Sequence, residues 1–233
     1  MLTFIYRLYQ LIVVVPLALL STFVTALVTS VGCIVGHSAF WSYWPGRLWG
    51  ATMCRLCLFP VHVEGRENLK PGQSYVFMSN HQGAFDIFLI YGFLHRPFKW
   101  MMKQSLRKVP FVGYACKCAG FIFVDRNSPT SIQHTMEQSR KILKNGMSLM
   151  IFPEGSRTKT GEIGRFKKGG FVLAEEVGLP IVPMTIDGPF QVLPPQKGLS
   201  FVKWHRLTIK IHPAVMPGEG AMEKVREAIV NNK

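Results

Sequence analysis

The sequence predicts an α/β protein whose largely parallel central sheet is flanked by helices and preceded by an N-terminal pair of hydrophobic helices. From about Val61, short β-rich runs such as SYVFMSN, GFIFVDR, SLMIFPEG and RLTIKIHP alternate with helical patterns, as expected of a layered α/β domain. No Asp, Glu, Lys or Arg occurs from Leu8 to Gly46. We therefore predict a membrane-inserting helical segment over 1–58 and an α/β domain over 59–233.

The composition supports a folded, basic protein. The chain has 233 residues, of which 48% are hydrophobic, so it can bury a full core and is not a disordered chain. Its 27 Lys and Arg against 13 Asp and Glu give a net charge of +14. This charge favours an anionic membrane surface, a phosphorylated substrate or a nucleic acid. Nucleic-acid binding would explain only the charge, so we expect a lipid bilayer as partner and no nucleic acid.

The apolar N-terminal run is long enough to cross a hydrocarbon core as a helix. A signal peptide would have a shorter apolar run and a cleavage site of small residues, and a buried soluble helix remains a second alternative. The run carries a stripe of small residues that would let another helix approach closely in lipid, namely Ala18, Thr22, Thr25, Thr29, Gly32 and Gly36. We expect this stripe to pack on residues 41–58. Whether the pair spans the bilayer or enters one leaflet stays open.

One helix of the α/β part has clear boundaries. Asn127, Ser128 and Pro129 are typical of a helix start, and Asn145-Gly146 of its end. The predicted helix connects the strands of GFIFVDR and SLMIFPEG, so both strands should run in the same direction. In open α/β sheets, ligands bind at the carboxyl ends of such strands.

Asn80, His81 and Asp86 interrupt two apolar runs in SYVFMSNHQGAFDIFLI, residues 74–90. On one regular helix, His81 and Asp86 would lie about 140° apart. If a strand ends near Met78, a turn follows and Asp86 lies in the first turn of a helix, the carboxylate can reach the imidazole. A carboxylate on one ring nitrogen leaves the other free as a general base. The alternative is that Asp86 caps the helix and His81 is a surface loop residue.

Neither a metal site nor a protein nucleophile is expected. The five cysteines include Cys54-x-x-Cys57 and Cys116-x-Cys118, but their apolar surroundings favour free thiols in a reducing compartment over a zinc site. The G-x-S-x-G motif of serine hydrolases does not occur in the sequence. The base would therefore act on a hydroxyl group of the substrate.

Four segments, in this order and spacing, resemble the conserved blocks of the glycerolipid acyltransferase family: NHQGAFD (80–86), GFIFVDR (120–126), FPEGSR (152–157) and IVPM (181–184). The resemblance covers about residues 60–215. It implies transfer of an acyl group from acyl-CoA or acyl-carrier protein to 1-acyl-glycerol-3-phosphate, which gives phosphatidate. Such an enzyme needs no cofactor besides its acyl donor substrate.

The same resemblance implies the roles of particular residues. His81 would be the general base and Asp86 would orient it, without a covalent acyl-enzyme. Residues expected to bind the acceptor are Arg126, Glu154, Gly155 and Arg157, with Lys103 as a further cation. We expect the enzyme on the cytoplasmic face of the cell membrane. Two alternatives remain, acylation of another lysolipid and a non-catalytic membrane module that binds lipid.

Overall fold

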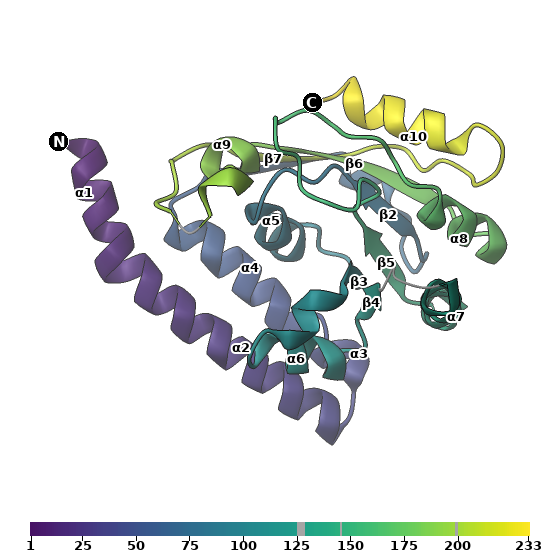
Figure 1. Cartoon of the computed structure of the whole chain (residues 1–233), viewed down its shortest axis with the longest axis horizontal. Helices are drawn as coiled ribbons and strands as arrows, with labels where there is room; N and C mark the ends of the chain where they lie inside the picture. Colours follow the sequence, from purple (N-terminus) through teal and green to yellow (C-terminus); the bar gives the residue numbers. More distant parts are fainter. Residues whose placement is uncertain (125–128, 145, 199) are drawn as a thin grey trace.

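The centre of the molecule is a seven-stranded sheet with strand order β1-β7-β6-β2-β5-β3-β4 (Figure 1). The structure is a computed structural model, and it describes residues 1–124, 129–144, 146–198 and 200–233. Neighbouring strands are parallel throughout this sheet except at the β6–β7 pair. The predicted α/β fold with a largely parallel sheet is confirmed. The strands are β1 (Val61–Glu64), β2 (Val76–Ser79), β3 (Phe98–Lys103), β4 (Ile122–Val124), β5 (Ser148–Ile151), β6 (Ile181–Asp187) and β7 (Leu207–Ile211).

Helices cover both faces of this sheet (Figure 1). The chain forms α1 (Leu2–Tyr9), α2 (Val15–Val35), α3 (Ser38–Trp41), α4 (Trp44–Leu56), α5 (Phe85–Phe93), α6 (Val112–Cys118), α7 (Pro129–Lys144), α8 (Gly169–Val177), α9 (Pro189–Val192) and α10 (Ala221–Val230). A π-helical turn over Gln10–Val14 joins α1 to α2, and 3-10 turns lie at Arg66–Asn68, Gln104–Lys108 and Pro195–Lys197.

Two hydrophobic clusters, one on each face of the sheet, form the core. Phe77 of β2 points toward α5, whereas Val76 and Met78 point toward the cluster of α7, α8 and α10. All four residues of β2 are buried, as is typical of a parallel strand covered on both faces. The central strands therefore appear in the sequence as continuous apolar runs. Polar residues follow the carboxyl end of β2.

The predicted connection between two parallel strands is confirmed. Helix α7 lies between β4 and β5, and both of these strands pair in parallel with β3. The proposed N-cap residues of this helix lie outside the described residues. The carboxyl ends of β2, β3, β4 and β5 consequently meet at one edge of the sheet.

The N-terminal helix is longer than the apolar pattern indicates, because helical structure begins at Leu2 and continues to Val35. Within the described part of the chain, this 34-residue helix is the one that is long and apolar enough to cross a membrane, and the mean hydropathy of its most apolar 18-residue window is 2.6. Only 11% of its most apolar window is buried. Most of its surface is therefore available to lipid.

The small-residue stripe of α2 does contact the following segment, as predicted. The indole nitrogen of Trp49 donates a hydrogen bond to the Thr22 hydroxyl at 3.0 Å. A Cβ atom on Gly32 would lie 2.4 Å from the Trp41 ring, so only glycine fits there. The partner is not one continuous helix, because α3 ends at Trp41 and α4 begins at Trp44.

Helix α4 also packs closely on α5. A Cβ atom on Gly50 would lie 2.6 Å from the Phe88 carbonyl oxygen, and one on Gly92 would lie 2.5 Å from the Ala51 nitrogen. The two backbones therefore touch. This contact joins the N-terminal helices to the helix that begins at the predicted catalytic residues.

Candidate active site

The loop between β2 and α5 brings His81 and Asp86 together. Strand β2 ends at Ser79 and α5 begins at Phe85, so Asp86 lies in the first turn of the helix. The Nδ1 atom of His81 lies 2.7 Å from the Oδ2 atom of Asp86. This is the strand, turn and helix arrangement that the spacing predicts, and the contact between the two side chains is present.

Asp86 is fully buried and has several partners. Its Oδ2 atom accepts hydrogen bonds from the main-chain N–H groups of Gln82, at 2.6 Å, and Gly83, at 3.0 Å. The carboxylate thus fixes the loop as well as the imidazole. The N–H groups that bind the carboxylate belong to the loop before α5, so Asp86 orients His81 and fixes this loop instead of capping the helix.

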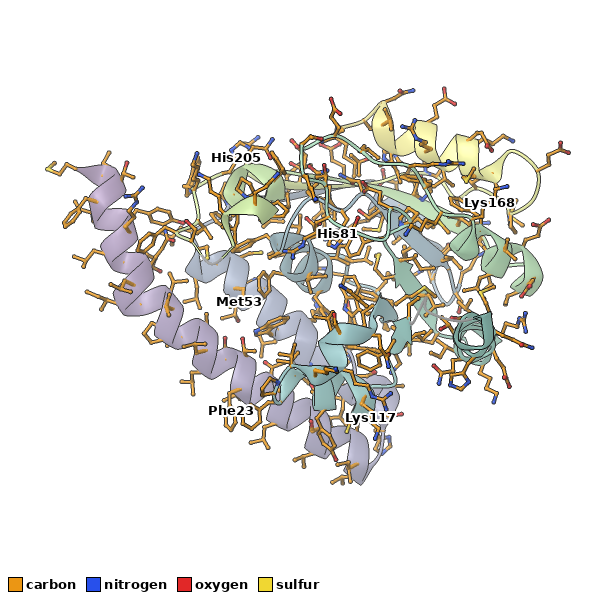
Figure 2. The ribbon with its side chains drawn as sticks, in the orientation of Figure 1. Phe23, Met53, His81, Lys117, Lys168 and His205 are labelled. Atoms are coloured by element: carbon orange, nitrogen blue, oxygen red, sulfur yellow. The ribbon has the colours of Figure 1, made fainter. Side chains whose placement is uncertain are left out.

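The His81 ring lies flat against Phe152. The ring centroids are 3.8 Å apart, and the ring planes differ by only 7°. The Trp100 ring also stacks on Phe152, and the centroids of these two rings are 5.8 Å apart. The stacking on Phe152 holds the imidazole in one plane. The His81 side chain, labelled in Figure 2, keeps 17% of its surface exposed, so the imidazole still reaches solvent.

Glu154 connects the loop of His81 to the segment that follows β5. Its two carboxylate oxygens accept hydrogen bonds from the main-chain N–H groups of His81 and Gly164, both at 2.7 Å. Burial raises the pKa of the Glu154 carboxyl, and these two hydrogen bonds oppose the rise. Both partners of the Glu154 carboxylate are main-chain groups of the protein.

Two further contacts hold the loop from neighbouring segments. The main-chain N–H of Thr158 donates to the His81 carbonyl oxygen at 2.9 Å. Asn80 is fully buried, and its side-chain amide makes two hydrogen bonds with the main chain of Ile186, at 2.8 and 2.7 Å. The first and third sequence blocks and the end of strand β6 therefore meet around His81.

The other predicted acceptor residues are placed as follows. Arg157 is exposed and immediately precedes Thr158, the residue that bonds to His81. Gly155 has a φ of 77°, a conformation that favours glycine, and its N–H closes a turn on the Phe152 carbonyl. Lys103 is exposed at the carboxyl end of β3. Arg126 lies outside the described residues.

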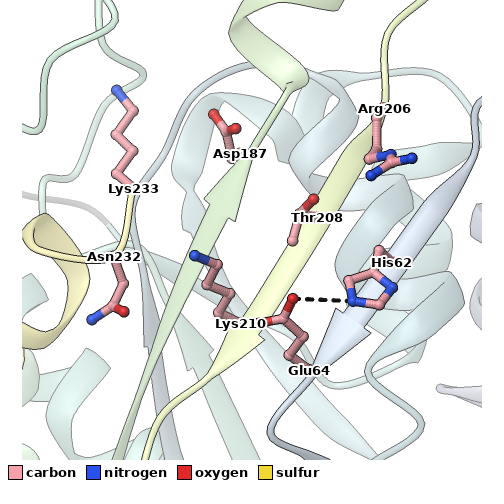
Figure 3. A pocket seen from close by; sticks show the side chains of 8 residues that line it. All are labelled: His62, Glu64, Asp187, Arg206, Thr208, Lys210, Asn232 and Lys233. Atoms are coloured by element: carbon pink, nitrogen blue, oxygen red, sulfur yellow. Dashed lines mark ion pairs between the residues drawn. The ribbon is translucent and has the colours of Figure 1, made fainter.

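A polar hollow lies elsewhere on the molecule (Figure 3). Its lining includes His62, Glu64, Thr208 and Lys210, on strands β1 and β7. The alternate residues of β7 are buried in the cluster that packs against Phe152. The hollow and His81 therefore lie on opposite faces of the sheet, and we do not assign this hollow to the reaction.

Three residues around His81 are given no role by the sequence alone. Phe152 supports the imidazole, Asn80 fixes the loop to β6, and the Thr158 N–H bonds to the His81 carbonyl. Asn80 directly follows β2 and Phe152 directly follows β5, and both residues lie within the quoted blocks. Their positions at strand ends could have indicated that they belong to the site. Thr158 offered none, because its contribution comes from the main chain.

Comparison with known proteins places this site in a family. The chain is 34% identical over 149 residues to a chloroplastic 1-acyl-sn-glycerol-3-phosphate acyltransferase of Arabidopsis thaliana, which covers 64% of this chain and 41% of the relative. It is 37% identical over 123 residues to a 1-acyl-sn-glycerol-3-phosphate acyltransferase of Pseudomonas aeruginosa, which covers 52% and 47%. The chain thus spans less than half the length of each of these relatives.

The similarity extends to a solved structure. The crystal structure of a 1-acyl-sn-glycerophosphate acyltransferase from Thermotoga maritima superposes with a TM-score of 0.69 at 26% identity, covering 92% of this chain and 93% of that one. The model of the acyltransferase family matches residues 60–187, more than half of the chain, and this range contains His81, Asp86 and Glu154. The chain therefore belongs to the acyltransferase family.

Proposed function

We propose that this protein transfers a fatty acyl group from an acyl thioester, acyl-CoA or acyl-carrier protein, to the free hydroxyl of 1-acyl-glycerol-3-phosphate. The product is phosphatidate. The observation that carries the proposal is the 2.7 Å contact between His81 and a buried Asp86, in a loop that the segment after β5 and strand β6 hold in place. The activity named for the relatives supports the same acceptor.

His81 acts as the general base. The Asp86 carboxylate accepts a hydrogen bond from the Nδ1–H group of His81, which leaves the lone pair of Nε2 free. Stacking on Phe152 fixes the plane of the ring. The free nitrogen can then accept a proton from a hydroxyl placed next to it, and the Asp86 charge stabilises the imidazolium that forms.

The acceptor hydroxyl is the nucleophile. Among the described residues, no serine or cysteine side chain is hydrogen-bonded to the His81 ring, so we assign no covalent acyl-enzyme. As Nε2 takes the proton, the acceptor oxygen attacks the thioester carbonyl carbon and a C–O bond forms. The C–S bond then breaks, and the leaving thiolate receives the proton from the imidazolium.

The protein positions the acceptor through its phosphate group. Arg157 lies one residue from a main-chain contact with His81, and its guanidinium can make paired, charge-assisted hydrogen bonds with phosphate. Lys103 supplies a second cation at the same edge of the sheet. Holding both substrates together contributes on the order of 7–11 kcal/mol in such reactions, against about 10²- to 10⁴-fold from the base.

The reaction takes place at a membrane surface. The lipid-accessible helix over Leu2–Val35 holds the domain at the bilayer, where a lysolipid has its headgroup at the interface and its chain below it. We place the α/β domain on the cytoplasmic side, because basic residues favour that side and Arg47 and Arg55 follow the apolar helix. The enzyme then need not extract its acceptor into water.

An acceptor panel tests this function. Purified protein in vesicles receives acyl-CoA or acyl-carrier protein with 1-acyl-glycerol-3-phosphate or with lysolipids that carry other headgroups, and the products are identified by mass. We expect phosphatidate as the main product, formed about 10²- to 10⁴-fold more slowly by a folded His81→Ala variant. Faster acylation of another lysolipid would replace the proposed acceptor, and the absence of any acylated lipid would overturn the enzymatic function.

A further inference from the structure

The segment between β3 and β4 forms a second exposed apolar surface beside the N-terminal helix. It includes the 3-10 turn Gln104–Lys108 and α6, and we call residues 106–117 the 106–117 surface. Four of its side chains are large, apolar and exposed to between 40% and 65%, namely Leu106, Val109, Phe111 and Tyr114. A soluble protein rarely leaves such a group of side chains exposed together.

Phe111 is held outward by a strained backbone. It has a φ of 58° and a ψ of −52°, and the N–H of Val112 bonds to the Pro110 carbonyl at 2.6 Å. This is the geometry of a γ-turn with positive φ, which is rare and unfavourable for a bulky residue. Gly113 makes the turn possible, because a Cβ atom there would lie 2.3 Å from the Arg107 carbonyl oxygen.

The 106–117 surface is continuous with the lipid-accessible side of α2. Helix α6 packs beside α2 (Figure 1), and the Phe111 ring meets the Phe23 ring edge-on with centroids 5.3 Å apart. Phe23 itself remains 45% exposed. The two rings therefore form one apolar patch that bridges the membrane helix and the α/β domain.

The polar residues of this surface are all positively charged. Arg107, Lys108 and Lys117 are exposed around the apolar side chains, and no Asp or Glu occurs from Ile87 to Val124 (Figure 2 labels Lys117). An apolar centre with a basic rim fits the interface of a bilayer that contains anionic lipid. A second copy of this chain fits poorly, because it would bring two basic rims together.

We propose that the 106–117 surface is a second membrane contact, in which Phe111 and its neighbours enter the interface of an anionic bilayer beside α2. The basic rim contacts lipid phosphates. This contact begins three residues after Lys103, so it holds the carboxyl edge of β3 against the bilayer. The N-terminal helix sets the distance of the domain from the membrane, and the 106–117 surface sets its orientation.

The test places a fluorescent probe on the full chain. Cys33, Cys116 and Cys118 are changed to Ser, the buried Cys54 and Cys57 are kept, and Phe111→Cys introduces one exposed cysteine for an environment-sensitive dye. Met216→Cys is the matched control, because Met216 is 67% exposed and Phe111 is 65% exposed. Leu27→Cys, at an exposed position of α2, is the reference for a site in lipid.

The labelled proteins are incorporated into vesicles of phosphatidylcholine and phosphatidylglycerol. We expect dyes at positions 27 and 111 to shift to shorter wavelength and to be quenched by spin-labelled lipid, while aqueous iodide quenches only the dye at position 216. Iodide quenching at 111 equal to that at 216 would overturn the proposal. Protection of position 111 from both quenchers would also overturn it, because a second protein surface would then cover it.

Discussion

Asp86→Asn is the most informative change at the candidate site, because it removes the charge and keeps the shape. An amide oxygen in the place of Oδ2 can still accept hydrogen bonds from the Gln82 and Gly83 N–H groups and from His81. The amide nitrogen takes the place of Oδ1, a buried atom that has no hydrogen-bond partner among the described residues. The new donor meets no acceptor there, so we expect a loss of about 1–3 kcal/mol in stability.

The catalytic effect should be much larger than this structural one. Without the carboxylate, the imidazolium formed during proton transfer has no buried counter-charge. The expected loss in kcat is about 10²- to 10⁴-fold, the range that a positioned base supplies. Asp86→Ala is a poor substitute, because two main-chain N–H groups would lose their acceptor at a total cost of about 2–6 kcal/mol.

The assay compares single and double variants. Initial rates of phosphatidate formation are measured for Asp86→Asn, His81→Ala and the combination, with thermal unfolding of each to establish that it is folded. Because Asp86 acts through His81, the double variant should be no slower than His81→Ala alone. Independent, multiplicative losses in the double variant, or retention of more than about a tenth of the activity by Asp86→Asn, would refute the assigned base.

Three other predictions follow from separate contacts. Arg157→Ala should raise the KM for the lysolipid and leave that for the acyl donor nearly unchanged; equal effects on both would contradict a phosphate site. Burial lowers the pKa of the Lys99 ammonium to about 8, so the folded state should gain up to about 2 kcal/mol between about pH 7.5 and pH 9.5 as this charge is lost. Lys99→Met should remove that gain in thermal unfolding scans. Gly32→Leu should displace the Trp41 ring and cost about 1–3 kcal/mol, whereas Val31→Leu, at an exposed neighbour, should leave the melting temperature unchanged.

The sequence by itself determined the fold class, because strand and helix periods alternate regularly from Val61 and the central strands are apolar on both faces. It also determined that His81 and Asp86 belong to a turn between a strand and a helix, since no single helix allows them to meet. The small-residue stripe of α2 was equally legible, and its contacts at Thr22 and Gly32 are present. All three features depend on the spacing of residues along the chain. The regular geometry of helices and strands determines from this spacing which side chains share a face.

Other features came only from the tertiary structure, because they depend on segments far apart in the chain. Glu154 lies 73 residues from His81 and bonds to its main chain, and Asn80 bonds to Ile186 over 106 residues. No local pattern specifies which main-chain groups a buried carboxylate or amide will reach. The stacking of Phe152 on His81 and the contact of Phe111 with Phe23 arise in the same way, from the order of strands in the sheet and the packing of α6 on α2. Local sequence thus fixes which residues end each strand, whereas tertiary packing decides which of those residues meet.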